Sequence, residues 1–176
     1  INQKGGVGKT TTVINLAAGL SMKGKKILVI DLDPQGNATT GLGLSNDVTS
    51  DKTIYNVLNG NKKISDVIQA TSFENLDLIT SNVDLSGLEV ETAGDNRRAF
   101  KLKDELTAIL NDSKASYDYI LIDCPPSLSL LTIMALVTSD ALVVPLQTEF
   151  FALEGLTQLM KTIDRIKSNL NPSLEI

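Results

Sequence analysis

Residues 4–11, Lys-Gly-Gly-Val-Gly-Lys-Thr-Thr, have the types and spacing of a loop that binds phosphate. In such a loop, glycines let successive backbone N–H groups point at one anionic centre, a lysine contacts the terminal phosphates, and a hydroxyl binds magnesium. Three glycines, one lysine and one threonine are available for these parts: Gly5, Gly6, Gly8, Lys9 and Thr10. The sequence therefore predicts a site for a nucleotide and its magnesium ion.

The residues around this loop add two features. Apolar residues recur at helical spacing after Lys9, and a helix that begins there directs unpaired N–H groups and the positive end of its dipole at a bound anion. The usual pattern, G-x-x-x-x-G-K-[ST], is altered at its start, because Gln3 stands where the first glycine is expected. Lys4 follows it, so the loop carries a second lysine.

Two apolar runs, which end at Asp31 and Asp123, supply acidic groups. If both runs are parallel strands, these carboxylates lie at the carboxyl edge of the sheet, where ligands bind. Asp123 is suited to hold Mg²⁺ through its water shell, because this ion gives up water reluctantly and bridges protein oxygens to phosphates. Asp33 would share a face with Asp31 on an extended backbone, although a turn at Pro34 can redirect it. For Asp31 two roles stay open, a magnesium contact through water and the capping of a turn.

Apolar periodicity predicts that helices and strands alternate along the chain. The expected helices are 9–23, 54–58, 65–68, 98–110, 128–137 and 151–170. The expected strands are 27–30, 76–80, 118–123 and 141–146. Continuous apolar strands are typical of parallel sheets covered on both faces. We therefore expect an α/β fold, a doubly wound, mostly parallel sheet flanked by helices.

Length, charge and aromatic content limit the number of domains and the kinds of nucleic-acid binding that the chain could show. The 176 residues suit a single domain with one core. A net charge of −5 argues against a uniformly basic nucleic-acid binder, and 4% aromatic residues are too few for base-stacking platforms. Basic pairs at 25–26, 62–63 and 97–98 could contact DNA, but such short clusters are more often solvated.

Cys124 is the single cysteine, and the sequence contains no histidine. An internal disulfide and a Cys/His metal cluster are therefore excluded within these residues, and a nucleophilic thiol would lack a histidine base. We expect a buried structural thiol in a reducing compartment. No apolar run reaches the length of a membrane span.

Both ends of the sequence affect the expected domain. A phosphate loop follows a strand, but only residues 1–3 precede this loop, and residues 174–176 resemble the start of another strand. We expect residues 1–176 to form a single P-loop ATPase domain that is incomplete at both termini.

Lys4 distinguishes this loop from the usual phosphate-binding loop. The pattern x-K-G-G-x-G-K-T-T resembles the deviant Walker A loop of the ParA/MinD superfamily of partition and positioning ATPases. Residues 31–37, 122–127 and 144–156 resemble ParA/Soj partition proteins rather than MinD, the nitrogenase iron protein or arsenical pump ATPases. The resemblance covers essentially all of the chain and implies a P-loop NTPase fold of the deviant Walker A type.

The resemblance also implies roles for individual residues. ATP and Mg²⁺ would bind at residues 4–11, which adds Val7 and Thr11 to the cofactor-binding residues. The implied catalytic residues are Lys4, Lys9 and Asp33, and those near magnesium are Thr10, Asp33 and Asp123. In the family the early lysine crosses a nucleotide-sandwich homodimer to the partner's ATP, and the second aspartate orients the attacking water. A cation supplied in trans can couple hydrolysis to assembly, as an arginine finger does.

The implied function is DNA segregation. The ATP-bound homodimer would bind DNA without sequence preference, through contacts in a C-terminal part beyond residue 176, and a ParB-like centromere-binding protein would stimulate hydrolysis. A cytoplasmic, nucleoid-associated location without a membrane partner follows from the same resemblance. Two alternatives stay open: a MinD-like membrane-cycling ATPase with a C-terminal amphipathic helix, and a metabolic ligase or amidotransferase-coupled synthetase with a carboxylate substrate pocket.

Overall fold

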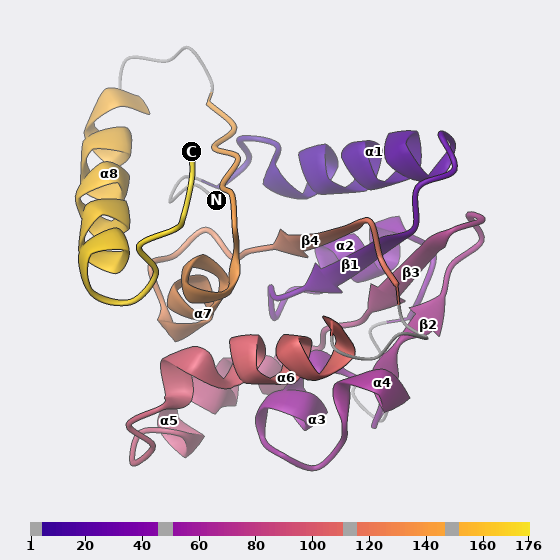
Figure 1. Ribbon diagram of the computed structural model, residues 1–176, viewed down its shortest axis with the longest axis horizontal. Coiled ribbons are helices and arrows are strands. Elements are labelled where there is room, and N and C mark those ends of the chain that lie inside the picture. Colours follow the sequence, from indigo (N-terminus) through magenta and orange to yellow (C-terminus); the bar gives the residue numbers. More distant parts are fainter. Residues whose placement is uncertain (1–4, 46–50, 111–115, 147–151) are drawn as a thin grey trace.

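The computed structural model describes residues 5–45, 51–110, 116–146 and 152–176 (Figure 1). Its α-helices are α1 (Lys9–Ser21), α2 (Asn37–Gly41), α3 (Ile54–Leu58), α4 (Ile64–Val67), α5 (Leu88–Glu91), α6 (Lys101–Leu110), α7 (Leu130–Thr138) and α8 (Ala152–Asn169). Two 3₁₀ helices, η1 (Val83–Gly87) and η2 (Arg98–Phe100), precede α5 and α6. The strands are β1 (Ile27–Asp31), β2 (Gln69–Ala70), β3 (Leu76–Ile79) and β4 (Tyr119–Asp123).

The four strands form one sheet in the order β2-β3-β1-β4. Strand β1 is parallel to both β3 and β4, and the short β2 is antiparallel to β3. In the register of β1 and β4, Asp31 lies opposite Asp123. The two aspartates that end these strands therefore reach the same edge of the sheet, as the sequence predicts.

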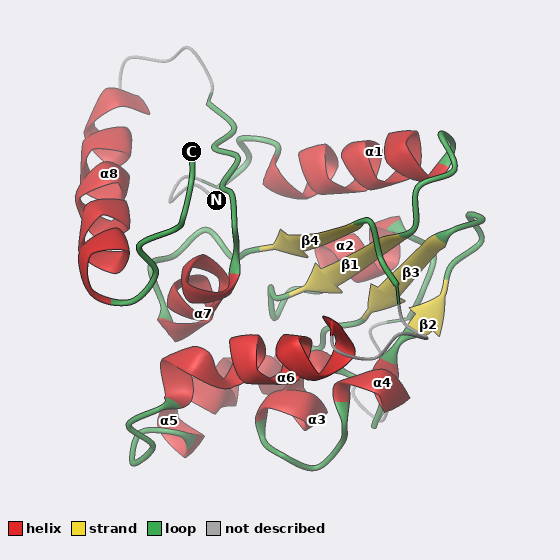
Figure 2. Cartoon of the chain, in the orientation of Figure 1, coloured by secondary structure: helices red, strands yellow, loops and turns green. Residues whose placement is uncertain are grey.

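Helices cover both faces of this sheet. Figure 2 shows α1 over one face and α6 with α3 over the other. Alternate side chains of β1 point to opposite faces, so Ile27 and Val29 belong to the core with Ala17 of α1, whereas Leu28 and Ile30 belong to a larger core under α6. A third core lies between α7, α8 and the C-terminal residues. The mostly parallel, doubly wound α/β architecture is confirmed.

Element boundaries depart from expectation in places. Helix α1 ends at Ser21 because Gly24 takes φ +76° and turns the chain toward β1. The expected helix 98–110 is divided into η2 and α6. Among the helices that the structure describes, none is long and apolar enough to cross a membrane.

The strand expected at 141–146 is wrong. In that segment the structure describes an isolated parallel bridge between Ala141 and Glu175 in place of a strand, and the side chains of Val143 and Leu146 are 62% and 50% exposed. An apolar run becomes a strand only when neighbouring strands satisfy its backbone N–H and C=O groups. Within the ranges given above, the segment belongs to none of the paired strands of the sheet, and its bridge with Glu175 is isolated.

Candidate phosphate-binding site

The loop before α1 depends on glycine for its conformation. Gly6 and Gly8 have φ values of +74° and +87°, in the left-handed region that other residues enter only at a cost. In the part of the chain with described coordinates, no atom lies within 4 Å of a Cβ built at Gly5, Gly6 or Gly8. The described atoms therefore leave open space beside these three glycines.

The N-terminus of α1 faces this loop. The carbonyl of Gly8 accepts hydrogen bonds from the backbone N–H (2.8 Å) and the hydroxyl (2.7 Å) of Thr12, which fixes the first turn. No acidic residue in that turn neutralises the positive end of the helix dipole, and Lys9 is its first residue. The helix end and the lysine together favour an anion.

Behind the loop, Thr10 and Asp123 meet. The Thr10 hydroxyl donates to Asp123 Oδ2 at 2.7 Å. Asp123 is buried, and its Oδ1 has no hydrogen-bond partner among the residues whose placement is described. A buried carboxylate oxygen without a partner is costly, and together with the neighbouring hydroxyl it forms a donor set that suits Mg²⁺. The residues present therefore fit this ion.

The charges around Asp123 show which residues the fold brings together. Burial raises the pKa of Asp123 above its ordinary value and the negative charge of Asp33 raises it further, while the hydrogen bond from Thr10 and the charge of Lys9 act in the opposite direction. Three predicted site residues, Lys9, Thr10 and Asp33, are thus close enough to affect the carboxylate of a fourth, Asp123. Among the described residues no three His, Cys, Asp or Glu side chains form a metal cluster, so Mg²⁺ would need phosphate and water as further ligands.

Asp31 and Asp33 occupy one turn but have different surroundings. Asp33 Oδ1 accepts the N–H of Gln35 at 3.0 Å, the pattern of an Asx turn. Asp31 is fully buried: its Oδ1 accepts the N–H of Asp33 (3.2 Å), and its Oδ2 accepts both the N–H and the hydroxyl of Thr39 (2.7 Å each). Burial raises the pKa of Asp31 to about 6 despite these hydrogen bonds, and the charge of Asp123 adds to the rise. These contacts favour capping of the turn over a magnesium contact for Asp31.

Sequence reasoning missed Thr39 and Ser81. The Thr39 hydroxyl also accepts the N–H of Ser81 at 3.0 Å, so it connects the turn after β1 with the segment after β3. No local motif could reveal this contact, because its partners lie eight and 42 residues from Thr39 along the chain.

The other predicted loop residues are less informative. Val7 is buried and Thr11 is exposed, with its carbonyl accepting the side-chain N–H of Asn15 at 2.8 Å. Lys4 lies outside the described residues. Its role stays a prediction.

Cys124 is predicted to be almost inert toward alkylation. Burial raises the pKa of its thiol to about 12, so the reactive thiolate at pH 8 is about a thousandfold scarcer than for a free cysteine with a pKa of about 8.5. Raising the pH from 7 to 9.5 increases the thiolate fraction of Cys124 in the native protein but leaves it small. In the unfolded chain the same thiol loses most of its protons over this pH range. Iodoacetamide labelling, mapped by mass spectrometry with and without denaturant, measures this difference. A native rate within tenfold of the denatured rate at pH 8 would contradict it.

Comparisons with known proteins bear on the whole chain. A family model for an AAA domain matches residues 1–176. The chain is 52% identical over 175 residues to the chromosome partitioning protein ParA of Caulobacter vibrioides. The matched region covers 99% of this chain and 64% of that protein. It is 49% identical over 176 residues to the sporulation initiation inhibitor protein Soj of Bacillus subtilis, at 99% and 67% coverage. The chain thus spans less than two thirds of the Caulobacter relative.

Solved structures show the same fold. Cobyrinic acid a,c-diamide synthase from Mycobacterium smegmatis, with bound ADP and magnesium, superposes with a TM-score of 0.91 at 38% identity, covering 99% of this chain and 69% of that one. A plasmid partition protein from Borrelia burgdorferi superposes with a TM-score of 0.81 at 32% identity, covering 100% and 73%.

Proposed function

The chain belongs to the AAA domain family and, within it, to the ParA/Soj proteins of the ParA/MinD superfamily, and from this premise we propose that it is the nucleotide-binding part of a DNA-partitioning ATPase. One observation carries the proposal: the Thr10–Asp123 hydrogen bond lies behind an open glycine loop at the N-terminus of α1. The loop supplies N–H groups, Lys9 supplies a cation, and Thr10 and Asp123 supply oxygen donors. These are the groups that bind ATP with Mg²⁺.

Each of these residues would then have a distinct task. Backbone N–H groups of residues 5–11 and the ammonium of Lys9 bind the phosphates, and Thr10 and Asp123 hold Mg²⁺, which neutralises phosphate charge when bound. Asp33, in its turn with Gln35, orients the attacking water. The Mycobacterium smegmatis structure with ADP and magnesium supports this assignment of the cofactors.

We place DNA binding outside the described surface. Each of the three basic pairs considered in the sequence has a member in an exposed ion pair: Lys25–Asp118 (3.3 Å), Lys62–Asp51 (2.6 Å) and Arg97–Asp104 (3.0 Å). Exposed pairs are solvated and carry little free energy, so they do not indicate a basic DNA-binding face. The proposal therefore assigns non-specific DNA contacts to the C-terminal part of the full-length protein, which acts in the cytoplasm on the nucleoid with a ParB-like partner.

A synthetase is the second candidate, because the Mycobacterium smegmatis structure is described as cobyrinic acid a,c-diamide synthase. Identity to the two partition proteins, 52% and 49%, exceeds the 38% to that structure and supports partition. The test is ATP turnover of the full-length protein with and without DNA and its ParB-like partner. Stimulation by both supports partition, whereas turnover that requires a carboxylate substrate and ignores DNA supports a synthetase. Binding to anionic vesicles that depends on ATP would support the MinD-like alternative.

Lys4→Ala is expected to retain ATP binding as a monomer and to lose the ATP-dependent dimer. A lysine that contacts the partner's nucleotide gains its favourable contact only after association, whereas a lysine acting within its own subunit would weaken monomer binding directly. Affinity is measured at protein concentrations too low for dimerisation. Dimer content is measured by light scattering at saturating ATP and Mg²⁺.

Lys23→Ala is the matched control, because it removes one positive charge from an exposed position just beyond α1. It should leave both measurements unchanged. An ATP-driven dimer of wild-type strength in Lys4→Ala would refute the role in trans.

A further inference from the structure

Thr39 is a fully buried residue of the short helix α2, and its hydroxyl joins two segments that are distant along the chain. The hydroxyl donates to Asp31 Oδ2 at 2.7 Å and accepts the backbone N–H of Ser81 at 3.0 Å. Asp31 is the last residue of β1, and Ser81 lies just beyond β3, the parallel strand beside β1. One side chain thus connects the segments that follow two neighbouring strands.

The backbone N–H of Thr39 also binds Asp31. This N–H belongs to the first turn of α2, where helical N–H groups have no partner within the helix. Gly36, the N-cap of α2, makes no side-chain hydrogen bond to that turn. Asp31 Oδ2 accepts the Thr39 N–H at 2.7 Å instead, and a carboxylate at a helix N-terminus is stabilising. Thr39 therefore holds one oxygen of Asp31 with two donors, its N–H and its hydroxyl.

The other oxygen of Asp31 holds Asp33. Asp31 Oδ1 accepts the N–H of Asp33 at 3.2 Å, and the neighbouring Leu32 donates its N–H to the carbonyl of Asp123 at 2.9 Å. The turn that carries Asp33 is thus attached to β4 through Leu32 and to β1 through the Asp31 carboxylate. The first attachment is between backbone groups, whereas the second depends on a carboxylate that Thr39 fixes.

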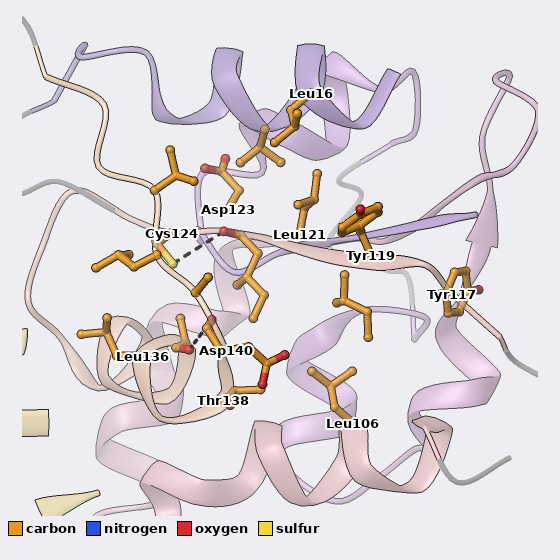
Figure 3. A pocket seen from close by; sticks show the side chains of 18 of the residues that line it. Leu16, Leu106, Tyr117, Tyr119, Leu121, Asp123, Cys124, Leu136, Thr138 and Asp140 are labelled. Atoms are coloured by element: carbon orange, nitrogen blue, oxygen red, sulfur yellow. Dashed lines mark hydrogen bonds between the residues drawn. The ribbon is translucent and has the colours of Figure 1, made fainter. Parts of the chain in front are cut away.

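The position of Asp33 matters because it lies near the proposed magnesium site. Its charge acts on the carboxylate of Asp123. Figure 3 shows that carboxylate on the side of β4 that faces α1, where Thr10 donates to it at 2.7 Å. In catalysis, a misplacement of about 1 Å caused by a change far from the reacting atoms can lower a rate about a hundredfold. A shift of the turn would therefore affect any reaction in which Asp33 takes part.

We propose that Thr39 is a positioning residue for Asp33: its hydroxyl holds the Asp31 carboxylate, which in turn holds the backbone N–H of Asp33. The proposal rests on the proposed ATPase function, in which Asp33 orients the attacking water. Thr39 is fully buried, so it acts on Asp33 through Asp31. Loss of its hydroxyl should lower turnover more than ATP binding, because residues 5–11 bind the phosphates in the proposed function.

Residue-resolved hydrogen exchange on the full-length protein tests the structural part of the proposal. In the wild type, the amides of Asp33 and Ser81 should exchange as slowly, within about tenfold, as the amide of Leu32. Leu32 is the internal reference, because its bond to the Asp123 carbonyl does not involve Thr39. Exchange of either amide more than about tenfold faster than Leu32 would overturn the proposal, and this comparison needs no variant.

Thr39→Val extends the same measurement, because it removes the hydroxyl and keeps the branched shape of the side chain. The Ser81 amide then loses its acceptor, and the Asp31 carboxylate that accepts the Asp33 amide loses a donor. Both amides should exchange at least about tenfold faster than in the wild type, relative to Leu32. Unchanged rates in the folded variant would overturn the proposal.

Turnover tests the functional part. Thr39→Val should lower kcat at least about tenfold while ATP affinity changes less than about twofold, the pattern of an interaction that matters in the transition state. Thr39→Ser keeps the hydroxyl and should recover kcat. Wild-type kcat in a folded Thr39→Val, a loss of affinity as large as the loss of kcat, or no recovery in Thr39→Ser would overturn the assignment of Thr39.

Thr80→Val is the matched control. Thr80 is also buried, and its hydroxyl donates to the carbonyl of Lys52 at 3.0 Å and accepts the side-chain N–H of Gln69 at 3.1 Å. The control removes a buried hydroxyl with the same kinds of hydrogen bond but other partners, so kcat of the folded protein should stay within about twofold of the wild type. A loss of kcat equal to that of Thr39→Val would overturn the assignment. Absence of ATP hydrolysis in the wild type would instead overturn the proposed function, and the exchange rates would still decide whether Thr39 holds the turn.

Discussion

Lys9→Ala is expected to abolish ATP binding at concentrations that saturate the wild type. Lys9 is the first residue of α1 and lies close enough to the Asp123 carboxylate to affect its charge, so its removal would take a cation away from the proposed phosphate site. Truncating one partner of a buried, hydrogen-bonded charge pair costs about 2–5 kcal/mol, which is a loss of about thirtyfold to several thousandfold in affinity. Titration with a fluorescent ATP analogue and Mg²⁺ measures this loss.

The control for this prediction is again Lys23→Ala, which also removes one lysine charge, but from an exposed position just beyond the C-terminal end of α1. It should bind ATP like the wild type. Circular dichroism and thermal unfolding establish that Lys9→Ala is folded. Near wild-type affinity in a folded Lys9→Ala would remove Lys9 from the site.

That these candidate site residues lie close together could be predicted from the sequence, because they stand at fixed places in a parallel α/β sheet. Asp31 and Asp123 each end an apolar run, and the observed register puts them opposite each other. The proximity of Asp33, Lys9 and Asp123 follows from the same rule, since loops after parallel strands meet at one edge of the sheet. No side-chain geometry was needed for this step.

Two features could not be predicted, for different reasons. The strand expected at 141–146 depends on a neighbour outside its own segment, so an apolar run alone does not determine whether it forms. The role of Thr39 depends on contacts with Asp31 and the N–H of Ser81. Such contacts follow from tertiary packing and leave no periodic signal in the sequence. Asp31, for which the sequence leaves two roles open, is interpreted through the same contacts.

Asp33→Ala is expected to bind ATP and accumulate as a dimer while losing turnover. Orientation of the attacking water matters in the transition state more than in the ground state, so kcat should fall while affinity changes little. Removal of a positioned acid–base group typically costs about a hundredfold to ten-thousandfold in rate. Size-exclusion chromatography with ATP and a phosphate-release assay measure the two effects separately.

Asp33→Asn separates this role from the local structure of the turn. Asp33 Oδ1 accepts the N–H of Gln35 at 3.0 Å, and the asparagine carbonyl can keep that hydrogen bond while the carboxylate charge is lost. If Asp33 acts on the water, both variants should lose turnover by similar factors and retain ATP binding. Recovery of turnover in Asp33→Asn would show that the turn, and not the carboxylate, is what catalysis needs. Normal hydrolysis in Asp33→Ala would show that another residue orients the water.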